Sequence, residues 1–272
     1  MHTRTHNRHR EAFERDGVVF PIDALSPVEI AGVRAAFDEV ESVVGREAAQ
    51  IGLVGKEREY AFLWNAATHP RILDAVESVL GPNLLLLGTH AFCKYPAAEM
   101  GKESFVAWHQ DATYWGLEPP RVVTAWLAID DVDEENGAMV VVAGSHTRGF
   151  YEHGKSEQEG NLLSVNQAIP ESDLDMSRAR LIEMKAGQIS LHDGLAVHGS
   201  RPNRSTRRRC GLTCRFAPPE IRVVAEANRK FEWQAVLVRG EDRCENITLL
   251  PAPEFKNGND YSGDSIVTGA QP

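Results

Sequence analysis

The sequence predicts an α+β fold that is mainly β, with a β-sandwich or barrel core and flanking N-terminal helices. Two segments before residue 83 carry apolar side chains at helical spacing. Beyond it lie several short segments rich in leucine, β-branched and aromatic residues, separated by Gly, Pro, Asn and Asp clusters. No internal repeat and no long linker divides the 272 residues. We therefore expect a single domain over residues 1–272, with 1–10 and about 240–272 peripheral or flexible.

Both expected helices have recognisable ends. The first, from Ser26 to about Gly45, begins with an N-cap serine, a proline at the first helical position and a glutamate that completes a capping box. The second runs from about His69 to Leu80 and stops at the Gly-Pro that follows it. Before them, residues 16–21 are typical of a short strand closed by a proline.

The β-rich part is expected to contain at least seven strands. A long, polar and partly irregular insertion at 148–180 interrupts them, and insertions of this length are uncommon unless they are functional. The strands are expected near 84–95, 105–110, 121–130, 138–142, 181–184, 188–193 and 208–217.

Composition argues against several kinds of partner. The formal net charge of −10 disfavours broad capture of nucleic acid or of anionic membranes. The chain has no apolar run of about 18 residues, and its basic, polar N-terminus lacks the apolar region of a secretory signal. The four cysteines form no CxxC pair, which disfavours a disulfide framework or a cysteine zinc site. We expect a cytoplasmic protein that binds a small molecule, and neither nucleic acid nor membrane.

Two histidines and an aspartate form the strongest candidate for chemistry. His109 and Asp111 stand two apart at the end of an expected strand, so both side chains lie on one face. His198 ends a second strand far downstream. Two histidines and one carboxylate form the facial triad that leaves positions open on iron(II). His192 precedes His198 with Gly194 between them, and we expect it in the core or supporting a ligand.

An arginine follows the second histidine at a spacing that allows its side chain to return toward the metal site. Arg209 stands eleven positions beyond His198, at the start of a strand that can return toward the metal site. The planar fork of a guanidinium suits a terminal carboxylate. Arg207 and Arg208 flank it, and we expect both to be solvated.

Four blocks of the sequence are distinctive, namely THAFCKYP at 89–96, WHQDATY at 108–114, AWLAIDD at 125–131 leading into ENGAMVVVAGSH at 135–146, and HGS…PNRS at 198–205. In these blocks and in their order, the sequence resembles the phytanoyl-CoA dioxygenase (PhyH) family of Fe(II)/2-oxoglutarate-dependent oxygenases, over roughly residues 10–220. The resemblance implies a double-stranded β-helix (jelly-roll, cupin-like) core, one Fe(2+), and 2-oxoglutarate and O2 as co-substrates.

The same resemblance implies roles for individual residues. It assigns the metal to His109, Asp111 and His198. It assigns the distal carboxylate of 2-oxoglutarate to Arg209 and Ser200, the wall of that pocket to Trp126, and a further co-substrate contact to His90. Candidate substrate residues, on position alone, are Gln110, Tyr114, Trp115 and Lys94.

The carboxylate of Asp111 also bears on the reaction. Halogenases of the family replace this residue with a small one, so its presence favours hydroxylation. We expect hydroxylation of an unactivated C–H in a small, polar organic substrate such as an amino acid, an aminophosphonate or a natural-product intermediate, with release of succinate and CO2. An acyl-CoA hydroxylase of the same mechanism, a non-oxygenase cupin-like metal protein and a silent 2-oxoglutarate binder are the alternatives.

Overall fold

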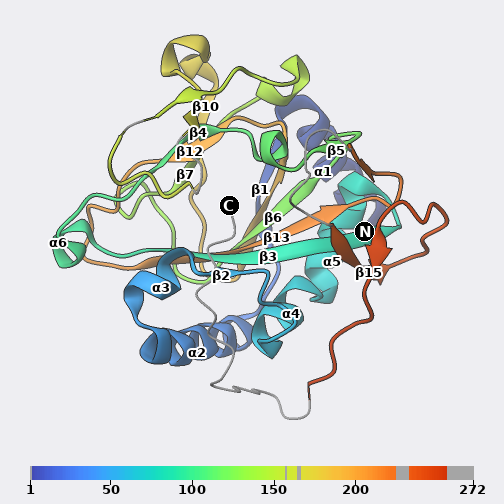
Figure 1. Cartoon of the computed structure of the whole chain (residues 1–272), viewed down its shortest axis with the longest axis horizontal. Coiled ribbons are helices and arrows are strands. Elements are labelled where there is room, and N and C mark those ends of the chain that lie inside the picture. The colour runs from blue at the N-terminus through green and yellow to red at the C-terminus, as the bar shows by residue number, and fades with distance from the viewer. Residues whose placement is uncertain (1, 157, 164–166, 225–232, 256–272) are drawn as a thin grey trace.

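Two β-sheets face each other, and helices cover the outer side of the larger one (Figure 1). The structure is a computed structural model that describes residues 2–156, 158–163, 167–224 and 233–255, with the backbone alone for 2–6. The larger sheet has the order β1-β11-β6-β13-β3-β15-β16, with β2 (Leu53–Val54) beside β3, and the smaller has the order β10-β7-β12-β4.

The chain alternates between these sheets. From β3 (Leu84–Lys94) in the larger sheet it passes to β4 (Val106–His109) in the smaller, then back to β6 (Val123–Ala128). The alternation continues to β13, except that β7 and β10 are paired within the smaller sheet, and it produces the jelly roll that the family resemblance implies. The other strands of the jelly roll are β7 (Met139–Val142), β10 (Ala179–Leu181), β11 (Gln188–Asp193), β12 (His198–Ser200) and β13 (Arg209–Ala217).

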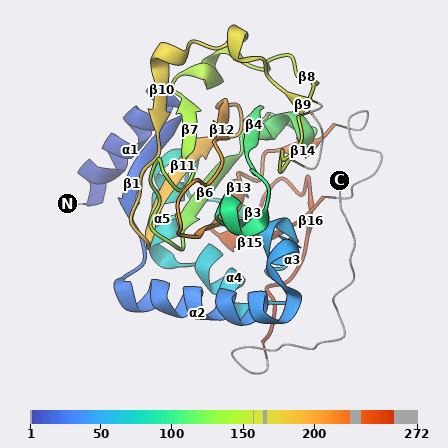
Figure 2. The ribbon, with the colours of Figure 1, turned by 90° about the vertical axis from the view of Figure 1, so that its left-hand side faces the viewer.

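Helices cover the outer face of the larger sheet from below in Figure 2. The capping box at the start of the first expected helix is present, since the Ser26 amide donates to Glu29 Oε2 at 2.7 Å and the Glu29 amide donates to Ser26 Oγ at 3.4 Å. Both expected helices are confirmed, and two short helices between them were not expected. The four are α2 (Pro27–Val44), α3 (Arg46–Ile51), α4 (Ala61–Ala67) and α5 (Pro70–Leu80).

The N-terminus differs from the expectation. Residues 1–10 carry no apolar pattern, yet the backbone from His2 to Asp16 forms the helix α1. Its last turn buries Phe13 in the core, and the helix contacts α5. The helix is therefore held to the core near its C-terminal end, by a residue that lies beyond the first ten, so the pattern of residues 1–10 could not indicate it.

Several strands were misplaced or missed. The strand at 16–21 extends as β1 (Val18–Asp23), and Pro21 is accommodated where the pairing with β11 is irregular. The one expected at 181–184 is displaced to β10. The expected polar end at 240–272 follows β15 and includes β16, while residues 256–272 lie outside the described part. Several short or C-terminal strands had no counterpart among the expected ones, namely β2, β5 (Leu117–Glu118), β8 (Gly154–Lys155), β9 (Gln167–Ala168), β12, β14 (Arg222–Val223), β15 (Gln234–Arg239) and β16 (Thr248–Leu249).

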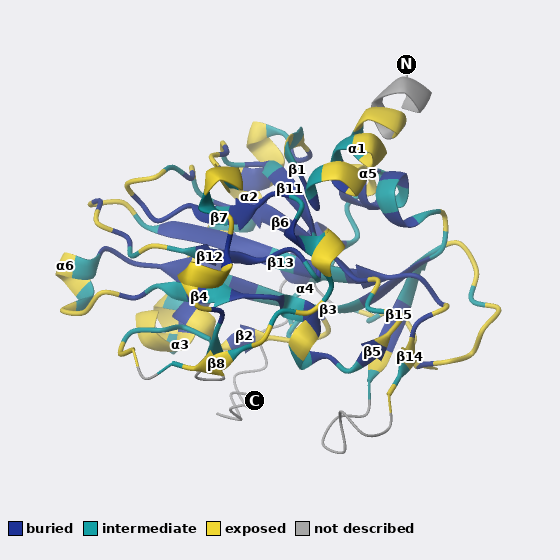
Figure 3. Cartoon of the chain, turned by 90° about the horizontal axis from the view of Figure 1, so that it is seen from above, coloured by how far each residue is buried: buried dark blue, intermediate teal, exposed yellow. Residues whose placement is uncertain are grey.

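Alternation along β13 separates the core from the functional interior. Cys210, Leu212 and Cys214 share one face of the strand and are fully buried under the helices. Arg209 and Arg215 point the other way, between the sheets. Figure 3 shows the strands of this central layer as the most deeply buried part of the chain. Among the described residues, no helix is long and apolar enough to cross a membrane.

Candidate metal and co-substrate site

The two histidines of the candidate site are direct neighbours in the smaller sheet. His109 is the last residue of β4 and His198 the first of β12, and the two are paired across the ladder. Asp111 follows two residues after β4, where a short 3₁₀ turn over Asp111–Tyr114 begins. A strand end, a neighbouring strand and a turn thus bring all three side chains to one point. The sequence predicted this convergence, but it placed Asp111 on the strand face and His198 at the end of a strand, whereas Asp111 lies in the turn and His198 begins β12.

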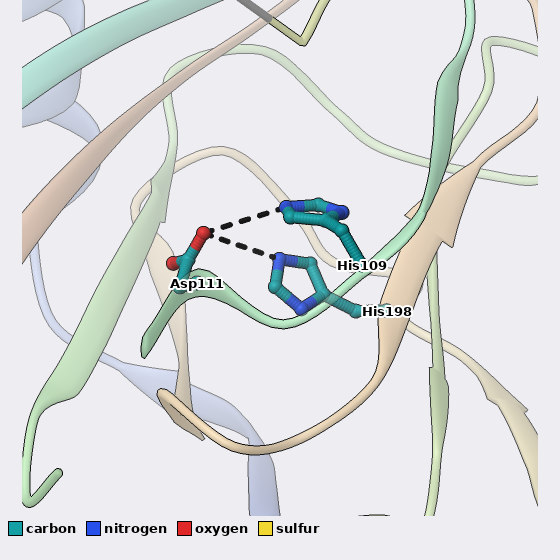
Figure 4. Close-up of side chains that lie close together, drawn as sticks. All are labelled: His109, Asp111 and His198. Carbon is teal, nitrogen blue, oxygen red and sulfur yellow. Dashed lines mark ion pairs between the residues drawn. The ribbon is translucent and has the colours of Figure 1, made fainter. Parts of the chain in front are cut away.

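The donor atoms of the three residues converge (Figure 4). His109 Nε2 lies 3.4 Å from Asp111 Oδ1, and His198 Nε2 lies 3.9 Å from the same oxygen. One ligand atom from each residue lies within 4.8 Å of the others. Two imidazole nitrogens and a carboxylate oxygen at this spacing fit a single first-row metal ion.

Backbone carbonyls fix the tautomer of both histidines. His109 Nδ1 lies 2.9 Å from the carbonyl oxygen of Ala107, and His198 Nδ1 lies 2.9 Å from that of Ala196. Since a carbonyl only accepts, each Nδ1 carries the proton and each Nε2 keeps its lone pair. The lone pairs are therefore directed at the common point near Asp111, which is the form of imidazole that binds metals.

The second oxygen of Asp111 meets the larger sheet. Thr124 Oγ1 donates to Asp111 Oδ2 at 3.3 Å, and His192 Nε2 lies 3.8 Å from that oxygen. Burial acts to raise the pKa of Asp111, but the imidazoles of His109 and His192 beside it hold that pKa well below its usual range. Burial lowers the pKa of His198. Both groups are thus held in the forms that a metal needs, carboxylate and neutral imidazole.

A second cluster lies deeper between the sheets and is cationic. Arg209 is 3% exposed, its guanidinium carbon lies 4.6 Å from the centre of the Trp126 ring, and its Nε has no hydrogen-bond partner. Burial lowers the pKa of Arg209 to about 10. Lys94 is fully buried, and its Nζ donates to Ser200 Oγ and to the carbonyl of Arg201, each at 2.5 Å. A buried guanidinium without a partner fits a carboxylate ligand.

A glycine makes room for the aromatic wall of this pocket. A Cβ atom on Gly211 would lie 2.0 Å from Cζ2 of Trp126. Gly211 is paired with Ala128, next to Trp126 on β6. Only a residue without a side chain lets the indole lie flat along β13 beside Arg209.

The remaining predicted residues lie in different places. Tyr114 lies near the metal ligands, with its ring centre 6.5 Å from that of His109 and its hydroxyl buried without a partner. Trp115 faces Arg215, whose guanidinium carbon is 5.7 Å from its ring centre. His90 Nε2 lies 3.0 Å from the carbonyl oxygen of Ile51 and is held by that contact.

Gln110 is engaged elsewhere. Its amide donates to the carbonyls of Gly149 and Leu195 at 2.8 and 2.6 Å and accepts from the Tyr151 amide at 2.8 Å. These bonds tie together the loops beside the site and occupy both N–H donors of the Gln110 side chain, which argues against a role for Gln110 in substrate binding.

Arg208 corrects the expectation of a solvated arginine. Its side chain, 20% exposed, forms ion pairs with Asp130 at 2.9 Å and Asp38 at 2.7 Å. Arg207 matches the expectation better, since it is 46% exposed and pairs with Asp133 at the surface. A third carboxylate, Glu41, lies 3.2 Å from Arg208. The partners of Arg208 come from α2 and from the loop after β6, so they could not be assigned to it from the sequence, because their side chains meet only in the folded chain.

The sequence reasoning missed Thr124 and Arg215, which belong to one row of residues across the larger sheet. The third member, His192, is buried beside Asp111, in agreement with the expectation that it lies in the core or supports a ligand. Thr124 is paired with His192 of β11 on one side and with Arg215 of β13 on the other. Asp111 contacts Thr124 and His192 of this row. Period-two alternation from Trp126 to Thr124 and from Arg209 to Arg215 was the available signal.

A jelly roll that holds a His-Asp-His set in its interior is the arrangement of non-haem iron oxygenases. The chain matches the phytanoyl-CoA dioxygenase (PhyH) family over residues 13–211 and belongs to that family.

Individual relatives agree with this assignment. The chain is 30% identical over 210 residues to the peroxisomal phytanoyl-CoA dioxygenase of Bos taurus. The alignment covers 75% of this chain and 61% of the bovine protein. It is 26% identical over 170 residues to a probable alpha-ketoglutarate-dependent hypophosphite dioxygenase of Stutzerimonas stutzeri. That alignment covers 62% of this chain and 58% of the relative. Among solved structures, the apo non-heme monooxygenase ThoJ shares 31% identity with a TM-score of 0.73, over 89% of this chain and 86% of that one.

Proposed function

We propose that this protein is an Fe(II)- and 2-oxoglutarate-dependent dioxygenase that hydroxylates an unactivated C–H of a small organic substrate and releases succinate and CO2. The observation that carries the proposal is the combination of two features in one interior. The facial set of His109, Asp111 and His198 would hold the metal. Arg209, buried and without a partner, would hold the distal carboxylate of 2-oxoglutarate.

Bound iron and 2-oxoglutarate would supply the oxidising chemistry, in which O2 is consumed and the co-substrate is decarboxylated. The chain's own work is positioning. The Ala107 and Ala196 carbonyls keep the two Nε2 lone pairs available, and Thr124 fixes the orientation of the Asp111 carboxylate. Trp126 and the fully buried Lys94 keep water away from the guanidinium of Arg209, which strengthens its attraction for a carboxylate.

The names of the relatives support this choice. The Stutzerimonas relative is described as alpha-ketoglutarate-dependent, and a Streptomyces exfoliatus relative, 30% identical over 148 residues, is a 1-deoxypentalenic acid 11-beta-hydroxylase. ThoJ, at 29% identity, has been captured as a nickel complex. We infer the same metal-binding character for this chain. A cytoplasmic location stays a prediction from the cysteine pattern.

The direct test is succinate release from 2-oxoglutarate, with Fe(II), ascorbate and O2, across a library of small organic acids, amino acids and acyl-CoA thioesters. We expect slow release without substrate and faster release with a small polar compound. Asp111→Ala serves as the blank, because it removes a metal ligand. Stimulation by acyl-CoA thioesters alone would favour the acyl-CoA hydroxylase. Metal-dependent turnover without 2-oxoglutarate would favour a cupin-like enzyme, and binding without decarboxylation a silent binder.

A further inference from the structure

Arg215 is a second arginine in the interior between the sheets, and neither metal binding nor 2-oxoglutarate binding assigns it a role. We propose that its guanidinium binds an anionic group of the organic substrate, so that the substrate is a small acid carrying a carboxylate or a phosphonate-type group. The inference rests on the proposed function and names the substrate class of the same site.

The position of Arg215 places it beside the metal ligands. It is paired with Thr124, and Thr124 is paired with His192, so the three form one row across the larger sheet. Side chains paired in this way have Cβ atoms about 4.5–5.5 Å apart and share a face. Asp111 Oδ2 accepts a hydrogen bond from Thr124, and its charge interacts with that of Arg215. Arg215 therefore faces the metal end of the interior.

Arg209 lies elsewhere on the same strand. It precedes Arg215 by six residues, which at about 3.4 Å per residue separates their Cα atoms by about 20 Å. Arg209 is paired with Lys94, whereas Arg215 is paired with Gly88. The two guanidinium groups thus serve different ends of the interior, and a 2-oxoglutarate bound at Arg209 leaves Arg215 available.

The guanidinium of Arg215 has no partner in the described part of the chain. Its Nε is buried without a hydrogen bond, and no ion pair to it is found there. The residue is half-buried, so a ligand can reach it. This contrasts with arginines outside the interior that pair with carboxylates, among them Arg34, Arg207, Arg208, Arg222 and Arg239.

Charge balance leaves Arg215 without a counter-ion. A divalent metal is neutralised by Asp111 and by one carboxylate of 2-oxoglutarate, and the other carboxylate matches Arg209. An arginine keeps its proton in proteins, and an unpaired buried charge is costly. The positive charge of Arg215 is therefore matched when the substrate brings an anion.

The side chains around Arg215 indicate the shape and polarity of the rest of the substrate. The Trp115 ring lies 5.7 Å from the guanidinium carbon, and Tyr114, the preceding residue, has a buried hydroxyl without a partner. Burial and the charge of Asp111 raise the pKa of Tyr114 to about 12, so its hydroxyl keeps the proton and can donate to an anion. An acid with a flat or apolar body fits between these groups.

One competing role must be separated from this one. Arg215 could serve only to balance the charge of Asp111, with no ligand of its own. Its removal would then weaken metal binding and leave the affinity for small acids unchanged.

Ligand binding without turnover distinguishes the two roles. The protein is loaded with Zn²⁺ and saturated with 2-oxoglutarate, so that neither the metal nor Arg209 is free. The probes are 4-fluorophenylacetate and its neutral amide, followed by ¹⁹F NMR, and phenylphosphonate, followed by ³¹P NMR. Wild type, Arg215→Met, Arg215→Lys and the control Arg243→Gln, an exposed arginine paired with Glu241, are compared.

We expect wild type and Arg243→Gln to bind at least one of the two acids at least tenfold more tightly than the amide. Arg215→Met should lose this preference, and Arg215→Lys should keep part of it. The affinity of Arg215→Met for 2-oxoglutarate should stay within about twofold of wild type, which reports an intact fold. If Arg215→Met does not fold, a partial loss of the preference for acids in Arg215→Lys tests the proposal instead.

Equal binding of acids and amide, equal acid binding by wild type and Arg215→Met, or displacement of 2-oxoglutarate by the acids would overturn the proposal. Failure of the dioxygenase proposal looks different, because 2-oxoglutarate itself would then not bind or not be decarboxylated.

Discussion

Lys94 and Arg209 are paired directly across β3 and β13, so two buried cationic side chains stand next to each other on one face of the larger sheet. Burial, and then the charge of Arg209, lower the pKa of Lys94 well below its usual range. Its Nζ donates to two acceptors, Ser200 Oγ and the Arg201 carbonyl. The Nε of Arg209 has no hydrogen-bond partner and is left for a ligand, whereas Lys94 holds Ser200 in place.

Substitution of Arg209 tests this division of roles. Arg209→Met should weaken 2-oxoglutarate binding by about 30- to 160-fold, since a buried charge-assisted pair contributes about 2–3 kcal/mol. Lys94→Met should weaken it less, because Lys94 acts through Ser200. The measurement is the dissociation constant for 2-oxoglutarate on metal-loaded protein. Unchanged affinity in Arg209→Met would remove Arg209 from the co-substrate pocket.

Gly211 offers a test of the close approach of Trp126. Gly211→Ala places a Cβ atom 2.0 Å from the indole, which must then shift. We expect a loss of about 1–3 kcal/mol in the free energy of unfolding, together with weaker 2-oxoglutarate binding. The matched control is Gly32→Ala in α2, where a Cβ meets nothing within 4 Å.

In the control, a helical glycine is replaced by a better helix former, so Gly32→Ala should stabilise the protein by about 0.5–1 kcal/mol. Urea unfolding measures both variants. Equal stability of the two variants would show that the indole yields easily to a side chain at position 211.

The sequence predicted the metal site better than its surroundings. His109, Asp111 and His198 come from a strand end, a turn and a second strand, and both motifs are visible as local patterns. Arg215 and Thr124 were missed because their role depends on the register between β6 and β13. Register is a tertiary property that local patterns specify only through which face is buried.

The same reasoning explains the errors in the fold. β12 is three residues long, so no alternation can develop in it, and the ladder with β4 and β7 defines it. The helix over residues 2–16 rests on contacts made by its last turn. The partners of Arg208 come from α2 and from the loop after β6, so its burial follows from the fold.

Arg207 and Arg208 are adjacent but should differ in their effect on stability. Arg208→Met removes partly buried, hydrogen-bonded ion pairs to Asp130, Asp38 and Glu41, and should cost about 1.5–3 kcal/mol of unfolding free energy. Asp130 keeps Arg34, and Glu41 keeps Tyr95, so neither carboxylate is left without a partner. Arg207→Met removes only surface pairs and should cost under about 1 kcal/mol. Chemical denaturation of the two variants gives both values. A larger loss in Arg207→Met would mean that the surface pairs dominate.

The pH dependence of stability should contain a contribution from His90. Burial, and then the charge of Arg215, lower the pKa of His90 to about 3 in the folded protein. Its ordinary pKa is about 6.5, so below that pH the unfolded chain takes up a proton that the folded chain does not. The contribution of His90 to the free energy of unfolding is therefore fully present above about pH 6.5 and is lost as the pH falls toward 3.

The size of this effect is set by one proton. Between pH 7.5 and 5.5 the wild type should lose about 1.4 kcal/mol of unfolding free energy that His90→Gln does not lose. Glutamine keeps a donor for the Ile51 carbonyl, which His90 Nε2 contacts at 3.0 Å, so the fold should persist. Urea unfolding of both metal-free proteins at the two pH values measures the difference. Parallel pH profiles for wild type and His90→Gln would show that His90 is protonated equally in the folded and unfolded states.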